Sequence, residues 1–143
     1  MDIKIIPPGG DLAEPMRIRE EVFTIEQGFA APDSDSYDPT ATHVMVYLDG
    51  VPAATGRFYA DGDTFHPGRV AVRKAFRGTG LGRVVMEALE QEAVRQGAKK
   101  LRLGAQLYAR PFYERCGYHA TGERYMDEFC EHEYMEKELP AGE

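Results

Sequence analysis

Hydrophobic residues along this chain follow two patterns, one typical of β-strands and one typical of helices. Short runs of alternating or clustered apolar residues, separated by glycine, proline or aspartate turns, predict strands over residues 2–6, 43–48, 51–59, 70–72, 100–105, 117–121 and 130–139. Residues 81–96 instead carry apolar side chains at i, i+3, i+4, i+7 and i+8, which predicts an amphipathic helix that Gly97 terminates. The two patterns together predict a mixed α/β protein.

Two further helices complete the predicted order of elements. A helical spacing of apolar residues begins after Asp11 and continues to Phe23, and residues 108–115 form a short helix that tolerates Pro111 only in its first turn. Asp49-Gly50 is a hairpin dipeptide, so residues 43–72 are expected to form an antiparallel meander. The Asp-, Ser- and Pro-rich segment 28–40 fits either a loop over an active site or a solvated connection.

Composition narrows the class of protein. With 143 residues, of which 43% are hydrophobic and 29% charged, we expect one globular domain that spans residues 1–143. No apolar run approaches the roughly 18 residues of a membrane helix, and the N-terminus lacks the pattern of a secretion signal. Two isolated thiols, Cys116 and Cys130, favour a reducing cytoplasm. The net charge of −7 argues against nucleic acid as a partner.

A basic, glycine-rich turn between the strand at 70–72 and the helix at 81–96 predicts an anion site. The first N–H groups of a helix lack partners, and the aligned peptide dipoles place about half a positive charge there. Gly78, Gly80 and Gly82 would let a phosphate approach the backbone closely. No acid occurs between Arg69 and Arg83, and the turn contributes mobile positive charge through Arg73, Lys74, Arg77 and Arg83.

Three phosphate-binding motifs compete for this turn, beside the plain alternative of a glycine-rich loop without a ligand. A P-loop ends in Gly-Lys-Ser/Thr, which Leu81-Gly82-Arg83 lacks. A dinucleotide fingerprint is G-x-G-x-x-G with an acid on the next strand, whereas this turn has G-x-G-x-G and the strand at 100–105 has no acid. Residues 77–82, Arg-Gly-Thr-Gly-Leu-Gly, resemble instead the Arg/Gln-x-x-Gly-x-Gly/Ala signature of the GNAT acyltransferases.

A second motif strengthens this resemblance. Residues 109–118, Ala-Arg-Pro-Phe-Tyr-Glu-Arg-Cys-Gly-Tyr, are similar to the family pattern Ala-x-x-Phe-Tyr-x-x-x-Gly-Phe, with Tyr118 in place of Phe. Gln106 stands where many members carry Asn. Two motifs in the correct elements are more specific than either alone. Residues 19–27, together with Asp127-Glu128, His132 and Met135, also resemble the ElaA/YjcF-like branch of the family.

The resemblance implies both a fold and an activity. The expected fold is a GNAT-type acyl-CoA N-acyltransferase domain, a mixed central sheet of about six to seven strands flanked by about four helices. The implied activity is transfer of an acetyl group from acetyl-CoA to a primary amine, by direct attack in a ternary complex and without a metal. The residues expected to bind acetyl-CoA are Val70, Ala71, Val72, Arg77, Gly78, Thr79, Gly80, Leu81, Gly82, Arg83, Gln106 and Tyr113.

The resemblance also implies catalytic residues. Tyr113 is the expected acid beside the thioester sulfur, but an ordinary tyrosine has a pKa of about 10 against about 8.5 for a thiol. Full proton transfer would run uphill by roughly 2 kcal/mol, so we expect Tyr113 to donate a hydrogen bond to the thiolate. An amine acceptor must lose a proton, and the leading candidates for the base are His132 and Glu26. Other candidates are Asp33, Asp35, His43, Asp127 and Glu128.

Several alternatives stay open at the level of sequence. Cys116 as a covalent nucleophile is disfavoured, because it ends a predicted helix, where the dipole raises the pKa of a thiol. Cys130-x-His132 is too small a cluster for a metal site, so no metal is expected. A CoA-binding sensor or interaction module without turnover and a nucleotide-binding interaction domain are the two competing functions. The expected partner is a small-molecule amine, not nucleic acid or a membrane; a homodimer is left open.

Overall fold

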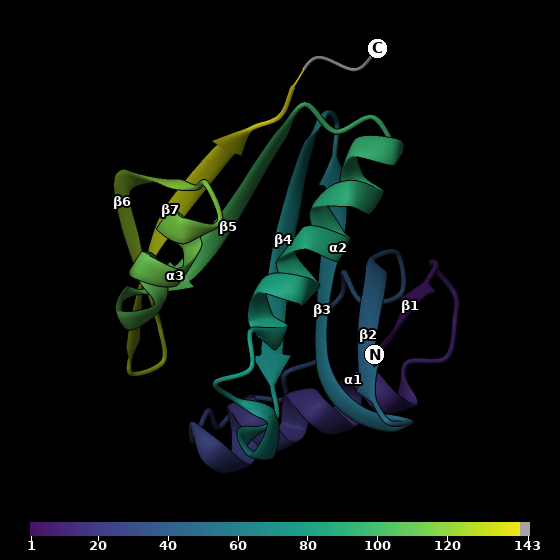
Figure 1. Ribbon diagram of the computed structural model, residues 1–143. Helices are drawn as coiled ribbons and strands as arrows, with labels where there is room; N and C mark the ends of the chain where they lie inside the picture. Colours follow the sequence, from purple (N-terminus) through teal and green to yellow (C-terminus); the bar gives the residue numbers. More distant parts are fainter. Residues whose placement is uncertain (141–143) are drawn as a thin grey trace.

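The computed structural model describes residues 1–140, so the last three residues of the predicted domain lie outside it. A seven-stranded mixed sheet runs through the protein in the order β1-β2-β3-β4-β5-β7-β6 (Figure 1). The strands are β1 Asp2–Ile6, β2 Thr42–Leu48, β3 Val51–Asp61, β4 Thr64–Val72, β5 Lys100–Gln106, β6 His119–Asp127 and β7 Cys130–Glu138. This confirms the predicted fold class and the number of strands.

The described residues contain three α-helices, fewer than the four that we expected: α1 Ala13–Arg19, α2 Leu81–Arg95 and α3 Arg110–Arg115. The segment after α1 does not form a separate α-helix, because the chain continues without a break into a π-helical stretch, η1 Glu20–Glu26. The predicted helix at 108–115 is divided between a 3-10 turn, η3 Leu107–Ala109, and α3. A further 3-10 turn, η2 Lys74–Phe76, precedes α2. None of these helices is long and apolar enough to cross a membrane.

Strands β1 to β4 form the predicted antiparallel meander. The turn between β2 and β3 is Asp49-Gly50, with positive φ at both residues (50° and 77°), as a tight primed hairpin turn requires. Gly122 interrupts β6 with a φ of 85°, where the register with β7 shifts. The predicted hairpin turn at Asp49-Gly50 is therefore confirmed.

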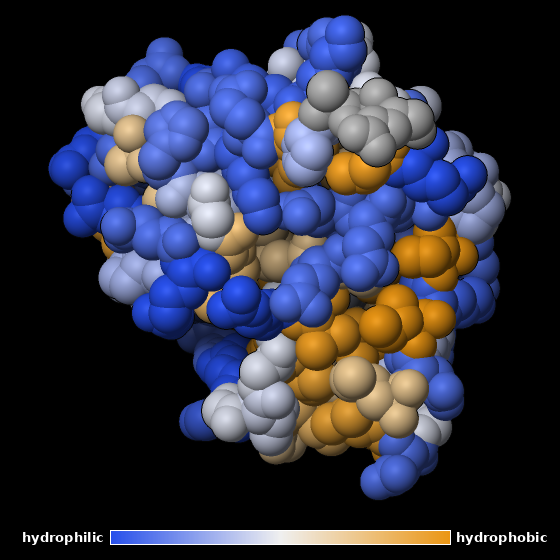
Figure 2. Space-filling model, turned by 45° about the horizontal axis from the view of Figure 1, so that its top comes forward, coloured by the Kyte–Doolittle hydropathy of each residue, from blue (hydrophilic) through white to orange (hydrophobic). Residues whose placement is uncertain are grey.

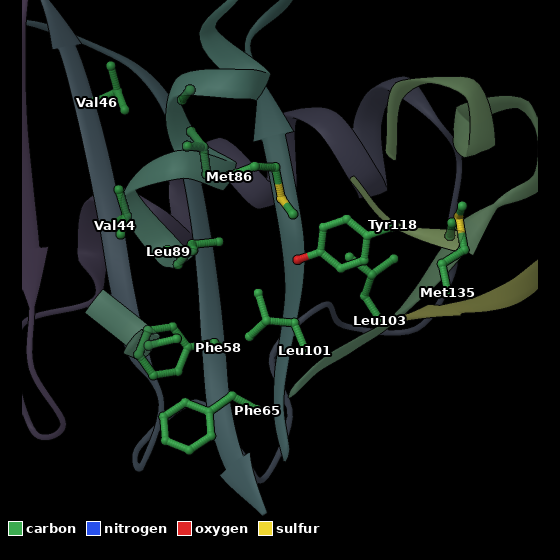
Figure 3. Packing of buried hydrophobic residues seen from close by; sticks show 14 of the residues in the cluster. Val44, Val46, Phe58, Phe65, Met86, Leu89, Leu101, Leu103, Tyr118 and Met135 are labelled. Carbon is green, nitrogen blue, oxygen red and sulfur yellow. The ribbon is translucent and has the colours of Figure 1, made fainter. Parts of the chain in front are cut away.

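Helices cover both faces of the sheet, and successive side chains of β2 point to opposite faces. Val44 and Val46 belong to the larger core, which α2 completes with Leu81, Val85, Met86, Leu89 and Ala93 (Figure 3). Met45 points to the opposite face, where Ile18 of α1 and Val22 of η1 are buried against it. Gly56 of β3 brings α2 close, since a Cβ there would lie 2.6 Å from Cγ1 of Val85. The sheet is thus held rigidly from both sides.

The sheet opens between β4 and β5. These strands are parallel and pair only at Thr64 with Lys100 and Phe65 with Leu101, after which they diverge (Figure 1). On its other side β4 carries a bulge, because Thr55 pairs with Ala71 and Arg57 with Gly68, and Arg69 has a φ of 51°. The second half of β4 therefore presents backbone groups to a space that β5 does not fill.

Candidate active site

A cavity of about 1200 Å³ occupies the opening between β4 and β5. Its walls are the second half of β4, the end of β5, the end of η1, the start of α3 and the β6–β7 hairpin. This one cavity is lined by all three predicted catalytic residues, Tyr113, His132 and Glu26. The fold thus brings together Glu26 and His132, which are more than 100 residues apart in the sequence. The same cavity is lined by six of the residues expected to bind acetyl-CoA besides Tyr113 itself: Val70, Ala71, Val72, Arg77, Gly82 and Gln106.

A second cavity of about 470 Å³ adjoins the first at the start of α2. The two cavities form one continuous cleft, because they share the lining residues Val72, Arg77, Gly82, Phe112 and Arg115. The smaller cavity is lined by most of the predicted anion-binding turn, namely Arg77, Gly78, Gly80, Leu81, Gly82 and Arg83. Thr79 lines neither cavity, because its hydroxyl donates to the carbonyl of Phe76 at 2.7 Å.

The turn has the backbone geometry of an anion cradle. Gly78 and Gly80 both have a φ of 82°, a left-handed conformation that favours glycine. Gly80 caps α2 without a side-chain hydrogen bond, so the first N–H groups of this 15-residue helix keep their donors available. Gly82 also lets α3 pack close to the turn, because a Cβ there would lie 3.2 Å from the ring of Phe112.

The basic side chains of the turn are largely paired with carboxylates. Arg73 pairs with Glu21 at 3.0 Å, and Arg83 with Glu87 at 3.3 Å. Arg77 binds Glu26 with both terminal nitrogens, one of them at 2.7 Å. Arg69 pairs with two aspartates across the cleft wall, Asp33 and Asp35. Of the four residues predicted to carry mobile positive charge, Arg73, Arg77 and Arg83 are each paired with a carboxylate, and only the partner of Arg83 is close to it in sequence.

Tyr113 lies half-buried in α3 with its ring edge-on to Phe112 and Tyr118, at centroid distances of 5.0 and 6.0 Å. Burial raises the pKa of its hydroxyl above the ordinary value. A phenol with a raised pKa stays protonated and so keeps a hydrogen to donate. Tyr108, at the start of the same helical segment, is 75% exposed and also lines the cavity.

His132 is buried in β7, and its ring stacks on Tyr125 with centroids 4.9 Å apart. Its Nδ1 lies 3.1 Å from the carbonyl oxygen of Cys130. A carbonyl can only accept, so this contact places the hydrogen on Nδ1 and leaves Nε2 with a lone pair. In this tautomer, the Nε2 atom of His132 can accept a proton.

Glu26 and Gln106 are both engaged with other side chains at the wall of the cleft. The hydrogen bonds from Arg77 hold the pKa of Glu26 below its ordinary value, although burial opposes them. Gln106 donates from Nε2 to Oε1 of Gln27 at 2.9 Å and so ties β5 to the end of η1. Both side chains line the larger cavity while they hold these partners.

The other predicted bases differ in their surroundings. His43 is 1% exposed, outside the lining of the cleft, and burial lowers its pKa, so its assignment as a candidate base is wrong. Asp33 and Asp35 are held by arginines. Glu128 accepts hydrogen bonds from the backbone N–H groups of residues 30 and 31, at 2.8 and 3.0 Å. Asp127 lines the cleft and has no ion-pair partner among residues 1–140.

The loop at 28–40 forms a wall of the cleft, although most of its residues are also exposed to solvent. Its three aspartates, Asp33, Asp35 and Asp38, form a buried network with Arg19, Arg57 and Arg69. At its start, Phe29 contacts Phe129 of the β6–β7 turn, with ring centroids 4.9 Å apart. The loop therefore bridges both halves of the sheet.

Sequence reasoning missed an aromatic group at the end of the cleft away from α2. Tyr59 stacks between Tyr37 and His66, at 3.9 and 4.9 Å, and Tyr125 contacts Tyr134 at 4.8 Å. The hydroxyl of Tyr125 lies over β5 at Gly104, where a Cβ would be 2.0 Å from it. The signal in the sequence was the alternation of aromatic residues at 125, 132 and 134 on the predicted hairpin.

The described residues also bear on the alternatives for Cys116 and for a metal. Burial raises the pKa of the Cys116 thiol, and this is a stronger reason than the helix dipole to discount it as a nucleophile. In residues 1–140, no three His, Cys, Asp or Glu side chains lie in a group that could hold a metal ion. The face of the molecule shown in Figure 2 is mostly hydrophilic, and the largest group of hydrophobic residues lies below the centre of the view.

Comparison with known proteins gives a consistent result. Residues 21–139 match the family model described as "Acetyltransferase (GNAT) domain". The uncharacterized N-acetyltransferase YjcF of Bacillus subtilis is 33% identical over 129 residues, which cover 89% of this chain and 92% of YjcF. An acyl-CoA N-acyltransferase from Pseudomonas aeruginosa has a similar structure, with a TM-score of 0.85, 26% identity, and 96% and 99% of the two chains covered. Escherichia coli ElaA has the same fold, with a TM-score of 0.86, 24% identity, and 96% and 99% covered.

Proposed function

This chain belongs to the GNAT acetyltransferase family, and we propose that it transfers an acetyl group from acetyl-CoA to a primary amine by direct attack in a ternary complex. The single observation that carries this proposal is the continuity of the cleft. One end meets the N-terminus of α2, and the middle contains the unpaired half of β4, with Tyr113, His132 and Glu26 around it. We further propose that residues 1–143 act as one domain.

The backbone of the chain would hold the co-substrate. The N–H groups from Gly78 to Gly82 would bind the diphosphate, because a helix N-terminus with glycines of positive φ presents several donors to one anion. The backbone of residues 70–72 would hydrogen-bond the pantetheine arm, since β5 leaves that side of β4 without a partner strand. A backbone N–H there would also polarise the thioester carbonyl. Bound CoA supplies the thioester; the residues named here supply its orientation.

Tyr113 would stabilise the leaving thiolate by donating a hydrogen bond. Its raised pKa makes proton transfer to a thiolate still less favourable than for an ordinary tyrosine, so the phenol keeps its proton. The proton that the thiolate finally takes up would come from the amine after attack. Hydrogen bonds to charged groups contribute about 1.5–3 kcal/mol, which corresponds to roughly 10- to 150-fold in rate.

His132 and Glu26 remain the two proposed bases for the acceptor amine. His132 has the free Nε2 of an imidazole, whereas the hydrogen bonds from Arg77 lower the pKa of Glu26 and make it a weaker base. We place the acceptor at the aromatic end of the larger cavity, opposite the anion cradle. The acceptor is proposed to be a small molecule, and the site of action the cytoplasm, where the free thiols of Cys116 and Cys130 stay reduced.

The proposal is tested by calorimetry with acetyl-CoA, followed by an amine screen that detects released CoA thiol. With an accepted amine, Tyr113→Phe should lower kcat about 10- to 100-fold while the Kd for acetyl-CoA stays unchanged. Tyr118→Phe is the matched control, since that hydroxyl is buried without a partner among residues 1–140 and lies outside both cavity linings. Absence of acetyl-CoA binding would refute the proposal. Binding without turnover for any amine would favour the sensor module.

A further inference from the structure

One ion pair joins the two halves of the cleft. Arg77 lines both cavities, and Glu26 lines only the larger one. The guanidinium of Arg77 donates from both terminal nitrogens to the two carboxylate oxygens of Glu26, and from Nε to the carbonyl of Val72 at 3.0 Å. Both side chains are only partly covered, with 40% and 32% of their surfaces exposed.

A phosphate bound beside Arg77 would compete with Glu26 for the same N–H donors of the guanidinium. A guanidinium binds a carboxylate or a phosphate with two parallel N–H donors, and the outer edge of Arg77 can serve only one of them at a time. Its Nε is already fixed by the backbone of β4, which keeps the side chain at the junction of the cavities. A diphosphate on the N–H groups of residues 78–82 would lie beside this edge and compete with Glu26.

We propose that Arg77 binds two anions in turn. The diphosphate of acyl-CoA displaces Glu26 from the two terminal nitrogens of Arg77 and thereby releases the Glu26 carboxylate into the acceptor half of the cleft. This inference rests on the proposed function. The consequence is an order of binding. Before acyl-CoA binds, Glu26 is neutralised; afterwards its charge is available to attract and hold a protonated amine. Loss of the Arg77 hydrogen bonds also removes the main influence that lowers the pKa of Glu26, so the released carboxylate is a better base.

A neighbouring ion pair provides an internal control. Arg73 and Glu21 are the same residue types, come from the same two segments and are similarly exposed (31% and 44%). However, Arg73 and Glu21 line neither cavity. A general effect of removing one negative charge would therefore appear in both pairs, whereas competition for the diphosphate would appear only at Glu26.

The test is a thermodynamic cycle on the Kd of acetyl-CoA, measured by calorimetry at low salt for wild type, Glu26→Gln, Arg77→Gln, the double variant and Glu21→Gln. Partly exposed ion pairs are weak, so removal of the competitor should tighten binding by about 1.5- to 5-fold in Glu26→Gln. The tightening should vanish in the Arg77→Gln background, and Glu21→Gln should stay within about 1.5-fold of wild type. Arg77→Lys, which keeps the charge but loses the fork, serves if Arg77→Gln does not fold.

The outcomes separate the two levels of the proposal. If wild type binds acetyl-CoA but Glu26→Gln binds it no more tightly, Glu26 does not compete with the diphosphate for Arg77, and the inference is overturned. It is overturned also if the tightening persists without Arg77, because a through-space charge effect then explains it. If the wild-type protein itself fails to bind acetyl-CoA, the proposed function falls and the inference falls with it.

Discussion

Replacing Arg57 with methionine tests whether the buried ionic network holds the wall of the cleft. Arg57 is 3% exposed and donates to Asp35 and Asp38 at 2.6 Å in each contact. Methionine fills a similar space but leaves both carboxylates short of a partner, and such a change in a buried pair costs about 3–5 kcal/mol. Unfolding entropies of about 2.1 cal/mol/K per residue amount to about 0.3 kcal/mol/K for a chain of this length. Thermal unfolding followed by circular dichroism should therefore show a Tm about 10–17 °C below wild type.

The control for Arg57 is an arginine whose ion pair is exposed. Arg95 on α2 pairs with Glu92 while 70% of its side chain is in contact with solvent. Arg95→Met should change Tm by less than about 2 °C. If Arg57→Met melts within about 3 °C of wild type, or no lower than the control, the network does not stabilise the fold and the loop has another anchor.

Three further predictions address the packing, the acceptor end and acid stability. Gly56→Ala forces a Cβ against Val85 in the main core and should cost about 1–3 kcal/mol in urea denaturation. Gly104→Ala displaces the hydroxyl end of Tyr125, so KM for the acceptor should change several-fold while the Kd for acetyl-CoA does not. Burial alone would raise the pKa of Asp38, but hydrogen bonds from arginines lower it far below its ordinary value. A carboxyl whose pKa is lower in the folded state stabilises the protein at pH values above its unfolded pKa of about 3.9, and this effect is lost as the pH falls. The stability of wild type should therefore decline below about pH 4. The decline should be smaller in Asp38→Asn, which lacks this carboxyl.

Local patterns were sufficient to predict most of the fold. The hairpin at Asp49-Gly50, the helix α2 with its apolar stripe and the stop at Gly97 depend on contacts between residues close in sequence, and the structure confirms all three. The end of α2 differs by one residue because helix ends are set by capping: α2 ends at Arg95, with Gln96 as its cap. Two strands are longer than predicted, since β4 begins six residues before residue 70 and β6 ends six residues after residue 121. The π-helical stretch η1 has no comparable local signal.

The parts of the site that depend on tertiary contacts were not predictable in this way. The pairing of Arg19 with Asp33 and Asp38 spans 14 and 19 residues, and Glu128 reaches residues that precede it by nearly 100. The divergence of β4 from β5 was also not predictable from the alternation of apolar and polar residues in either strand. It depends on how many residues of the two strands pair with each other. Sequence reasoning therefore found which residues face the cleft but not what holds them there.

The charge of the anion site shows most clearly what a local count omits. Between Arg69 and Arg83 the sequence contains only basic charges, yet Arg69, Arg73 and Arg77 are neutralised by acids that precede them by 34 to 52 residues. Only the pair between Arg83 and Glu87 follows a local spacing. Because peptide N–H groups carry no counter-ion, the cradle at residues 78–82 keeps its attraction for an anion when the side chains around it are paired. The initial affinity for a diphosphate should thus come from the backbone, and the arginines contribute only to the extent that a ligand displaces their carboxylates.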